Sequence, residues 1–378
     1  MGTTEQGSKR GGHSRHRGGS ASERAGDQER GIAAATRELD AAKLTLPVGK
    51  LNPQLLETLL RYTGAPDPRV RLGPRVGEDA AVIDFGDRYL VAKTDPITFA
   101  TDQIGWYLVQ VNANDLATTG AVPRWLLVTL LLPEAGTSPD LARAIFAQVN
   151  AACQELNIAI VGGHTEVTYG LERPIAVGHM LGEVEKDRLV TTAGACVGDD
   201  IVLVKGIAIE GTSLIAREKS AELRDRGYGD DVITRACNYL YDPGISVLRE
   251  ARLAMESVVV HAMHDPTEGG LATGLHELAM AANVGVWVDE AAVPIWPECA
   301  RLCEEFGLNP LGTIASGALL VAVPPSETQA LLSAYHDAGV RCACIGRITP
   351  ASQGLKMQSA AVVVDLPRFD QDEVTKLF

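Results

Sequence analysis

Gly77-Glu78-Asp79-Ala80-Ala81 is the first of four short polar signatures that occur in a fixed order along this chain. The other three are Lys93-Thr94-Asp95-Pro96, Asn112-Ala113-Asn114-Asp115 and Gly162-Gly163-His164-Thr165-Glu166. Each lies at the end of an apolar run, where a strand or helix can hold a polar side chain in place. Magnesium takes oxygen ligands and usually joins substrate phosphates to one or two protein carboxylates. Asp79, Asp95 and Asp115 therefore predict a Mg²⁺ site for a nucleoside triphosphate, the pattern of an ATP-using enzyme.

The composition agrees with a large folded chain. It has 378 residues, of which 46% are hydrophobic, so it can bury a sizeable core, and its length favours two domains. No apolar run approaches the roughly 20 residues of a membrane span, and the N-terminus lacks the apolar segment of a secretory signal. We expect a cytoplasmic protein without a membrane partner.

The net charge and the cysteine pattern limit which macromolecules and metals this chain is expected to bind. The formal net charge is −14, which argues against nucleic acid as the principal partner. Residues 1–45 form a basic tail rich in Gly, Ser and Arg, and the sequence predicts that this tail is disordered. The seven cysteines are scattered and include no paired CxxC set of the kind that binds zinc, so we expect reduced thiols, mostly in the core.

The apolar pattern of the first half predicts alternating helices and strands. A helical stripe covers residues 51–62, and two short strands at 80–85 and 89–93 flank Gly86-Asp87, a hairpin signal. Asp102 is placed to cap a helix that ends near Gly120, and on that helix Asn112 and Asp115 share a side. Further elements are predicted as a strand at 125–132, a helix at 139–156, and strands at 159–162 and 173–183.

After residues 184–198 the pattern restarts, so this stretch is the natural domain boundary. A strand at 201–205 leads into the Gly-rich turn 206–212 and a helix. The remaining predicted elements are helices at 271–282, 297–306 and 326–338, and strands at 285–289, 318–323 and 342–348. The sequence thus predicts an α/β fold with an N-terminal domain over 46–190, a C-terminal domain over 198–350 and an extension over 351–378.

The ordered motifs resemble those of the aminoimidazole-ribonucleotide (AIR) synthetase superfamily. To the four signatures the chain adds Asn114-Asp115-Leu116-Ala117-Thr118-Thr119-Gly120 and His264-Asp265-Pro266-Thr267-Glu268-Gly269-Gly270. Within this superfamily the C-terminal half is most similar to the hydrogenase-maturation branch, through Val286-Trp287-Val288-Asp289-Glu290 and residues 303–311. The resemblance covers about residues 46–350, and it is the order of the motifs that makes it specific.

The resemblance implies an N-terminal domain that dimerises through its sheet, a C-terminal α/β domain, and ATP with Mg²⁺ as cofactors. It implies a maturation partner protein and a homodimer, with an isologous interface that buries β surface from roughly residues 80–93 and 125–132. Carried over position by position, it makes Asp79, Asp95 and Asp115 the metal ligands. It implies a tight turn at Gly162, Gly163 and Thr165 that brings backbone N–H groups to the phosphates, with Lys93, Asn112 and Asn114 also at the nucleotide. His164, Asp265 and Glu268 are then the candidate catalytic residues that face the acceptor.

Several positions depart from the hydrogenase-maturation branch. That branch has a lysine, an arginine and a glutamate where this chain has Glu166, Glu268 and Ser316, and a histidine, His164, replaces the family's usual carboxylate. The branch carries its acceptor thiol on a C-terminal cysteine, whereas residues 371–378 here contain none. We therefore expect that this chain does not carbamoylate itself.

Three functions remain open at this point. The first is an enzyme that uses ATP to activate an oxygen of an acceptor, by phosphoryl transfer or by a ligase or dehydratase reaction. The second is a non-catalytic nucleotide-binding subunit with a maturation or regulatory role. The third is a small-molecule kinase resembling thiamine-phosphate kinase. Purely structural roles for single residues also remain open. Asp79 or Glu268 could cap a turn or helix, and His164 could hydrogen-bond to the backbone.

Overall fold

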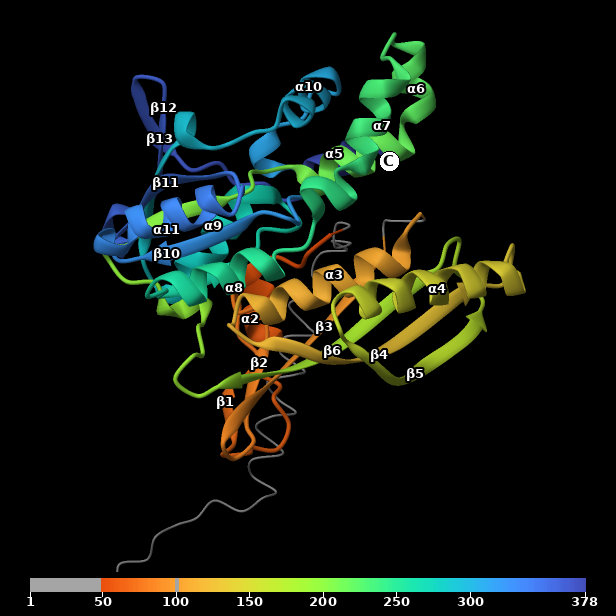
Figure 1. Cartoon of the computed structure of the whole chain (residues 1–378), viewed down its shortest axis with the longest axis horizontal. Coiled ribbons are helices and arrows are strands. Elements are labelled where there is room, and N and C mark those ends of the chain that lie inside the picture. Colours follow the sequence, from red (N-terminus) through yellow and green to blue (C-terminus); the bar gives the residue numbers. More distant parts are fainter. Residues whose placement is uncertain (1–48, 99–101) are drawn as a thin grey trace, which may run out of the picture. The chain divides into compact units, whose positions relative to one another are not determined.

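The computed structural model describes residues 49–98 and 102–378, so the tail predicted over 1–45 lies outside the described residues. Two β-sheets, each with its own helices, organise this part of the chain (Figure 1). The α/β fold with two sheet domains is thus confirmed. Sequence position separates the sheets, because strands up to Glu185 form the first sheet and strands from Asp200 onward form the second.

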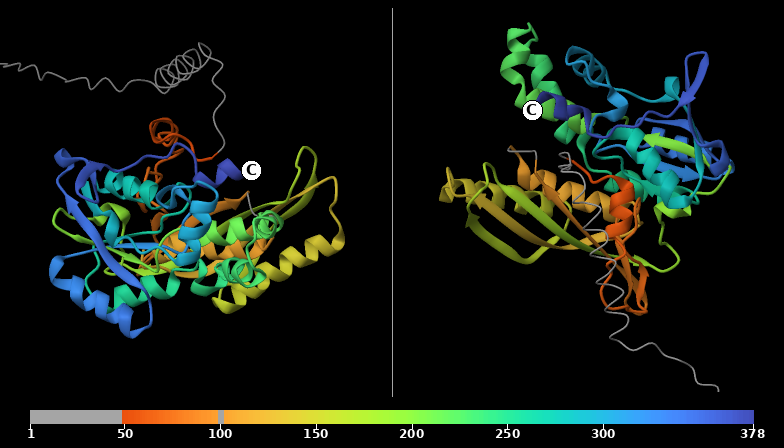
Figure 2. Two further views of the ribbon diagram at one scale, coloured as in Figure 1. Left: turned by 90° about the horizontal axis from the view of Figure 1, so that it is seen from above. Right: turned by 180° about the vertical axis from the view of Figure 1, so that it is seen from behind.

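The first sheet has six strands in the order β1-β2-β3-β6-β4-β5. Its strands are β1 (Val70–Leu72), β2 (Ala81–Asp84), β3 (Arg88–Ile97), β4 (Val122–Pro133), β5 (Ala159–Thr168) and β6 (Ile175–Glu185). Helices α3 (Ile104–Ala117) and α4 (Pro139–Glu155) supply apolar side chains to the core on one face, among them Leu108 and Val149. No helix of the described residues covers the opposite face in the views of Figure 2.

The second sheet has seven strands in the order β13-β12-β9-β11-β7-β10-β8. These strands are β7 (Asp200–Val204), β8 (Ala262–His264), β9 (Gly285–Asp289), β10 (Leu319–Val323), β11 (Cys342–Thr349), β12 (Leu355–Ser359) and β13 (Val362–Asp365). Strand β7 shows why both faces of this sheet are packed against helices. Its Ile201 and Leu203 belong to a core with helix α9 (Gly270–Ala282), while Val202 and Val204 belong to a core with α8 (Leu248–Ser257) and α11 (Pro325–Asp337). Such continuous apolar runs are typical of strands buried on both faces.

A third core joins helices next to the second sheet. They are α5 (Ile209–Glu218), α6 (Ser220–Asp225), α7 (Asp230–Asn238) and α10 (Pro297–Glu305). The buried Lys205, which follows β7, donates from Nζ to the carbonyl oxygens of Gly244 at 2.8 Å and Ser246 at 2.5 Å. This ammonium therefore satisfies carbonyl groups of the segment that enters α8.

Most predicted elements occur where the sequence placed them. The hairpin at Gly86-Asp87 joins β2 and β3, and the predicted strand at 285–289 is β9. The predicted cap is wrong, because α3 begins after Gln103 in the left-handed conformation and the Asp102 carboxylate pairs with Arg217 instead. The helix predicted over 51–62 is shorter, α2 (Pro53–Leu59), and it buries no residue.

The second sheet continues past residue 350, where the sequence predicted an extension. Strand β12 pairs in parallel with β9, and β13 pairs with β12 at the sheet edge. Helices α6, α7 and α8 were not predicted, and they are short, with 6, 9 and 10 residues. None of the helices in the described ranges is both long and apolar enough to cross a membrane.

Candidate functional site

Four loops and elements bring acidic side chains together between the two sheets. Asp79 lies two residues before the first residue of β2, Asp95 lies on β3, Asp115 lies in the last turn of α3, and Asp265 follows β8. One carboxylate oxygen each from Asp79, Asp115 and Asp265 lies within 4.8 Å of the other two. We call these four carboxylates the acidic cluster. The cluster joins Asp79 and Asp115, 36 positions apart in sequence, to a residue of the C-terminal half.

Lys93 lies inside the acidic cluster. Its Nζ is 3.3 Å from Asp115 Oδ2 and 3.4 Å from Asp95 Oδ2. Burial opposes the charge on Lys93, but the surrounding carboxylates outweigh it and raise its pKa above the usual value. Lys93 therefore stays protonated and compensates part of the negative charge.

Asp265 is the least compensated member of the acidic cluster. It is 2% exposed, and neither carboxylate oxygen has a hydrogen-bond partner among the described residues. Burial, followed by the charge of Asp79, raises the pKa of Asp265 to about 8. Burial likewise raises the pKa of Asp115, against the opposing effect of Lys93. A buried carboxylate without a partner is costly, so these oxygens fit a site that takes a divalent cation with hard oxygen ligands.

A chain of charged side chains around the buried His264 holds Asp79 in position. His264 Nδ1 lies 3.0 Å from Asp79 Oδ2, and His264 Nε2 lies 3.0 Å from Glu277 Oε2. On the far side, Lys50 Nζ lies 3.1 Å from Glu277 Oε1. Burial opposes protonation of His264, but Asp79 and Glu277 together raise its pKa well above the usual value. The imidazolium thus bridges two carboxylates and orients Asp79.

Glu277 and Lys50 were missed as site residues by sequence reasoning. Glu277 lies on α9, 13 positions after His264, and Lys50 precedes α2. No local spacing connects these residues, because the contacts between Lys50 and Glu277 span 227 positions. His264 did have a signal, since it directly precedes Asp265 in the 264–270 motif.

The side-chain amide groups of the two asparagines of α3 form hydrogen bonds with backbone groups. Asn112 Oδ1 accepts from Asp95 N at 2.9 Å, and its Nδ2 donates to Leu108 O at 2.9 Å. Asn114 Nδ2 donates to Ile245 O, and its Oδ1 accepts from Val247 N, both at 2.8 Å. Asn112 therefore places Asp95, and Asn114 joins α3 to the C-terminal half. A contact of either amide with nucleotide stays a prediction.

The predicted tight turn at Gly162, Gly163 and Thr165 is wrong. These residues lie within β5, in register with Leu127, Val128 and Leu130 of β4. A Cβ at Gly163 would lie 1.9 Å from Val128 O, so the close approach of β4 explains this glycine. The role of these three residues at the phosphates stays a prediction.

Within one chain, β5 and the acidic cluster lie apart. The same row across the sheet contains Asp95, Gly178, Val128 and Gly163 on β3, β6, β4 and β5. Three strand spacings separate Asp95 from Gly163, which is about 14 Å. His164 is exposed with its Nε2 3.2 Å from Glu166 Oε2, so the chain itself does not bring His164 to the cluster.

Glu268 and the C-terminal segment meet at the start of α9. Glu268 Oε1 accepts from Lys50 N at 3.2 Å, while the N–H of Gly269, the residue before α9, donates to Asp372 Oδ2 at 2.6 Å. Asp372 Oδ1 also accepts from Val374 N at 2.9 Å and Ile314 N at 3.2 Å. Asp372, rather than Glu268, therefore satisfies the helix start.

Known proteins match the chain over both sheets. The AIR synthase related protein, N-terminal domain, matches residues 77–184, and the AIR synthase related protein, C-terminal domain, matches residues 197–357. The carbamoyl dehydratase HypE of Rhodobacter capsulatus is 31% identical over 290 residues, which cover 74% of this chain and 80% of that protein.

Two solved structures share the fold. The hydrogenase maturation protein HypE in complex with ATP has a TM-score of 0.63 and 25% identity, over 86% of this chain and 97% of that one. The HypE–HypF complex has a TM-score of 0.62 and 19% identity, over 76% of this chain and 93% of that one, and it supports the fold alone. The two matched domains, the carbamoyl dehydratase relative and the shared fold place this chain in the AIR synthase related family.

Proposed function

We propose that this protein is an ATP-dependent enzyme that activates an oxygen of an acceptor by cleaving ATP. The observation that carries the proposal is the acidic cluster, in which the buried Asp265 has no partner among the described residues for either oxygen beside Asp79 and Asp115. The relative solved with ATP supports nucleotide use by this fold. The acceptor is an oxygen nucleophile such as a carboxamide, carboxylate, hydroxyl or phosphate.

The cluster residues have distinct roles in this proposal. Asp79, Asp95 and Asp115 hold Mg²⁺, and Asp265 adds a fourth carboxylate from the C-terminal half. When bound, the metal neutralises phosphate charge and aligns the transferred group. Lys93 contributes a permanent positive charge among the carboxylates. His264 and Glu277 keep Asp79 oriented, and Glu268 lies where the 264–270 loop faces an acceptor.

A homodimer would account for the exposed strand β5. This strand is at the edge of the first sheet and exposes Ile160, Val161 and Val167. In an isologous dimer each copy covers the open face and β5 edge of the other. His164, Gly162, Gly163 and Thr165 would then approach the nucleotide from the second copy. We also propose a role in hydrogenase or metal-cofactor maturation with a partner protein, supported by the name of the relative solved with ATP, a hydrogenase maturation protein.

The first prediction tests the metal site with a nonhydrolysable ATP analogue and Mg²⁺ in calorimetry. Asp115→Asn and Asp95→Asn should each weaken binding at least tenfold, because each removes a charged oxygen ligand. Asp87→Asn is the matched control, since Asp87 is exposed on the β2–β3 hairpin, and it should bind like the wild type. Unchanged affinity in both cluster variants would refute the site.

A turnover assay separates the enzyme from a nucleotide-binding subunit. ATP hydrolysis is measured with a panel of oxygen acceptors, with and without maturation partner proteins. An acceptor-dependent rate that Asp265→Asn abolishes supports the enzyme. Tight Mg·ATP binding with no acceptor-dependent turnover by any member of the panel would favour the non-catalytic alternative.

A further inference from the structure

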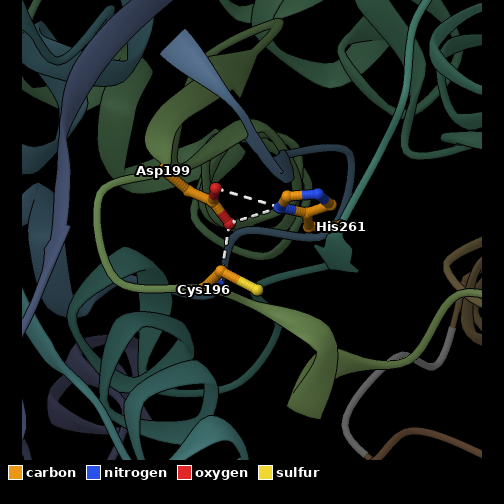
Figure 3. A group of neighbouring side chains, drawn as sticks. All are labelled: Cys196, Asp199 and His261. Atoms are coloured by element: carbon orange, nitrogen blue, oxygen red, sulfur yellow. Dashed lines mark hydrogen bonds and ion pairs between the residues drawn. The ribbon is translucent and has the colours of Figure 1, made fainter.

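A second group of metal-binding side chain types lies outside the acidic cluster. Cys196 and Asp199 come from the loop before β7, and His261 immediately precedes β8 (Figure 3). One possible ligand atom from each residue lies within 4.8 Å of the other two. This group combines a thiol, a carboxylate and an imidazole from two segments, with Asp199 and His261 62 positions apart.

The turn from Cys196 to Asp199 places two of these side chains together. Asp199 N donates to Cys196 O at 3.0 Å, and Cys196 N donates to Asp199 Oδ2 at 2.8 Å. Gly198, at φ +101°, allows the turn. Two ligands separated by two residues on a tight turn are also the arrangement of the Cys-x-x-Cys pairs in zinc sites.

His261 is fixed against this turn by backbone packing. Its N–H donates to Ala322 O at 3.0 Å, which holds it to β10, and its Nδ1 lies 2.9 Å from Asp199 Oδ1. A Cβ at Gly194 would lie 2.2 Å from His261 O. Only glycine therefore lets the loop approach His261 this closely, and the three side chains meet because the two segments are tightly packed.

We propose that Cys196, Asp199 and His261 bind a zinc ion, with a fourth position open to water. Thiolate, imidazole and carboxylate are the ligands of zinc, whereas magnesium and calcium prefer oxygen alone. Cys196 is exposed and His261 is half-buried, so the ion can enter from solvent. Tetrahedral zinc ligands lie about 3.5 Å apart, so side-chain shifts of about 1 Å complete the site.

The proton balance of binding follows from the contacts present without metal. Cys196 Sγ–H donates to Gly194 O at 3.3 Å, and the His261 Nδ1–H faces Asp199. Zinc binding releases the thiol proton to solvent and moves the imidazole proton from Nδ1 to Nε2, leaving Nδ1 as the ligand. Zinc affinity should therefore increase as pH rises, as for any site that must lose a proton.

The zinc would fix the loop that leads to the acidic cluster. Thr192 N and Ala193 N, in the same loop, donate to the carboxylate of Glu78 at 3.2 Å and 3.1 Å. Thr192 Oγ1 donates to Met263 O at 3.3 Å, next to His264. A zinc ion bound by Cys196, Asp199 and His261 would thus stabilise both the contact with Glu78 and the position of the strand that carries His264.

The test is a cobalt titration of the metal-free full chain, followed by displacement with zinc. The wild type should show thiolate-to-cobalt charge transfer and the strong visible bands of four-coordinate cobalt, and zinc should abolish both. Cys196→Ser should remove the charge-transfer band and weaken zinc binding at least tenfold. Cys237→Ser is the matched control, a partly exposed cysteine on α7, and it should retain the band.

Two further variants separate the zinc site from the acidic cluster and from unfolding. Asp115→Asn should retain the charge-transfer band, because the acidic cluster contains no thiolate. His261→Gln should weaken zinc binding at least tenfold, with its secondary structure checked by circular dichroism. Absence of the band in the wild type, or its persistence in Cys196→Ser, would overturn the proposal, and so would its loss in Cys237→Ser. None of these results depends on ATP binding.

Discussion

Gly163 shows how one residue in a recognised motif is determined by packing. Its φ is +149°, and a Cβ at this position would lie 1.9 Å from Val128 O, so there is no room for a side chain. Gly163→Ala should lower the free energy of unfolding by about 2 kcal/mol or more, through strain and displacement of β5. Gly73→Ala is the control, since its Cβ would meet only Val70 Cγ1 at 3.5 Å. Equal denaturation midpoints for both variants would contradict this explanation.

Glu210 is a buried carboxyl group that should make stability depend on pH. It is 8% exposed, and Oε2 has no hydrogen-bond partner among the described residues. Burial, aided by the nearby Asp372 and Glu268, raises its pKa to about 7 against the hydrogen bond from Ser316. Tyr107 on α3 also faces Glu210, without a charge of its own at neutral pH.

The sign follows from proton linkage. Because the folded-state pKa is raised, the stabilising contribution of Glu210 is fully present below about pH 4.5 and is lost as pH rises toward 7. Glu210→Gln should therefore match the wild type near pH 5 and be more stable by about 2–3 kcal/mol at pH 8. Denaturant unfolding of both proteins at several pH values measures this difference. Asp372 is present in both, so its own titration cancels when the variant is compared with the wild type. If the free energy of unfolding depended on pH in the same way in both proteins, Glu210 would not be the source of this pH dependence.

At the scale of elements, Asn114 connects α3 to the segment that enters α8. It is fully buried, and both of its hydrogen bonds to that backbone are 2.8 Å long. Asn114→Ala should destabilise the nucleotide-free protein by about 2–3 kcal/mol, because Ile245 O and Val247 N lose their partners. Asn150→Ala, exposed on α4, should change stability by less than about 0.5 kcal/mol. An unaltered unfolding curve for Asn114→Ala would show that the connection is unimportant.

Helix α9 illustrates how an element and a site depend on each other. Its N-terminal residue Gly270 has a φ of +66°, and the preceding Gly269 N–H is bound by Asp372 from the end of the chain. The same helix carries Glu277 to His264. The same helix therefore contacts both the C-terminal segment and the histidine that orients Asp79.

At the scale of the whole molecule, the exposed edge strand β5 indicates how two copies of the chain would pair. The strands first expected at the interface, 80–93 and 125–132, lie inside the sheet with neighbours on both sides, and they can contribute only through the open face. Strand β5 is the long edge strand of this sheet, whereas β1 at the other edge has only three residues. We expect a homodimer at micromolar concentration by light scattering, and Val161→Lys should weaken it at least tenfold, since charge on an edge strand disfavours pairing.

The second sheet offers a matched control for this experiment. Val362 lies on β13, one of the two edge strands of that sheet, and it is exposed to a similar degree as Val161, at 61% against 53%. Val362→Lys should leave the dimer intact. A monomeric wild type, or equal dissociation of both lysine variants, would show that β5 is not the interface.

Local patterns in the sequence determined much of this architecture. The apolar run 201–204, the alternation around Gly86-Asp87 and the helix following the 264–270 motif each use short-range signals of period and turn chemistry. The ordered carboxylates also identified Asp79, Asp95 and Asp115 as candidates, and the family and fold were confirmed. These features depend on residues close together in sequence.

Only the tertiary structure decided which candidates meet. It brought Asp265 to Asp79, linked Lys50 to Glu277 across 227 positions, and joined Cys196 and Asp199 to His261. It also showed that Gly162 and Gly163 lie in a strand, where sheet pairing outweighs the local turn preference of glycine. The physical reason is that strand order and helix packing bring distant segments together, whereas sequence periodicity reports only which face of each element is buried.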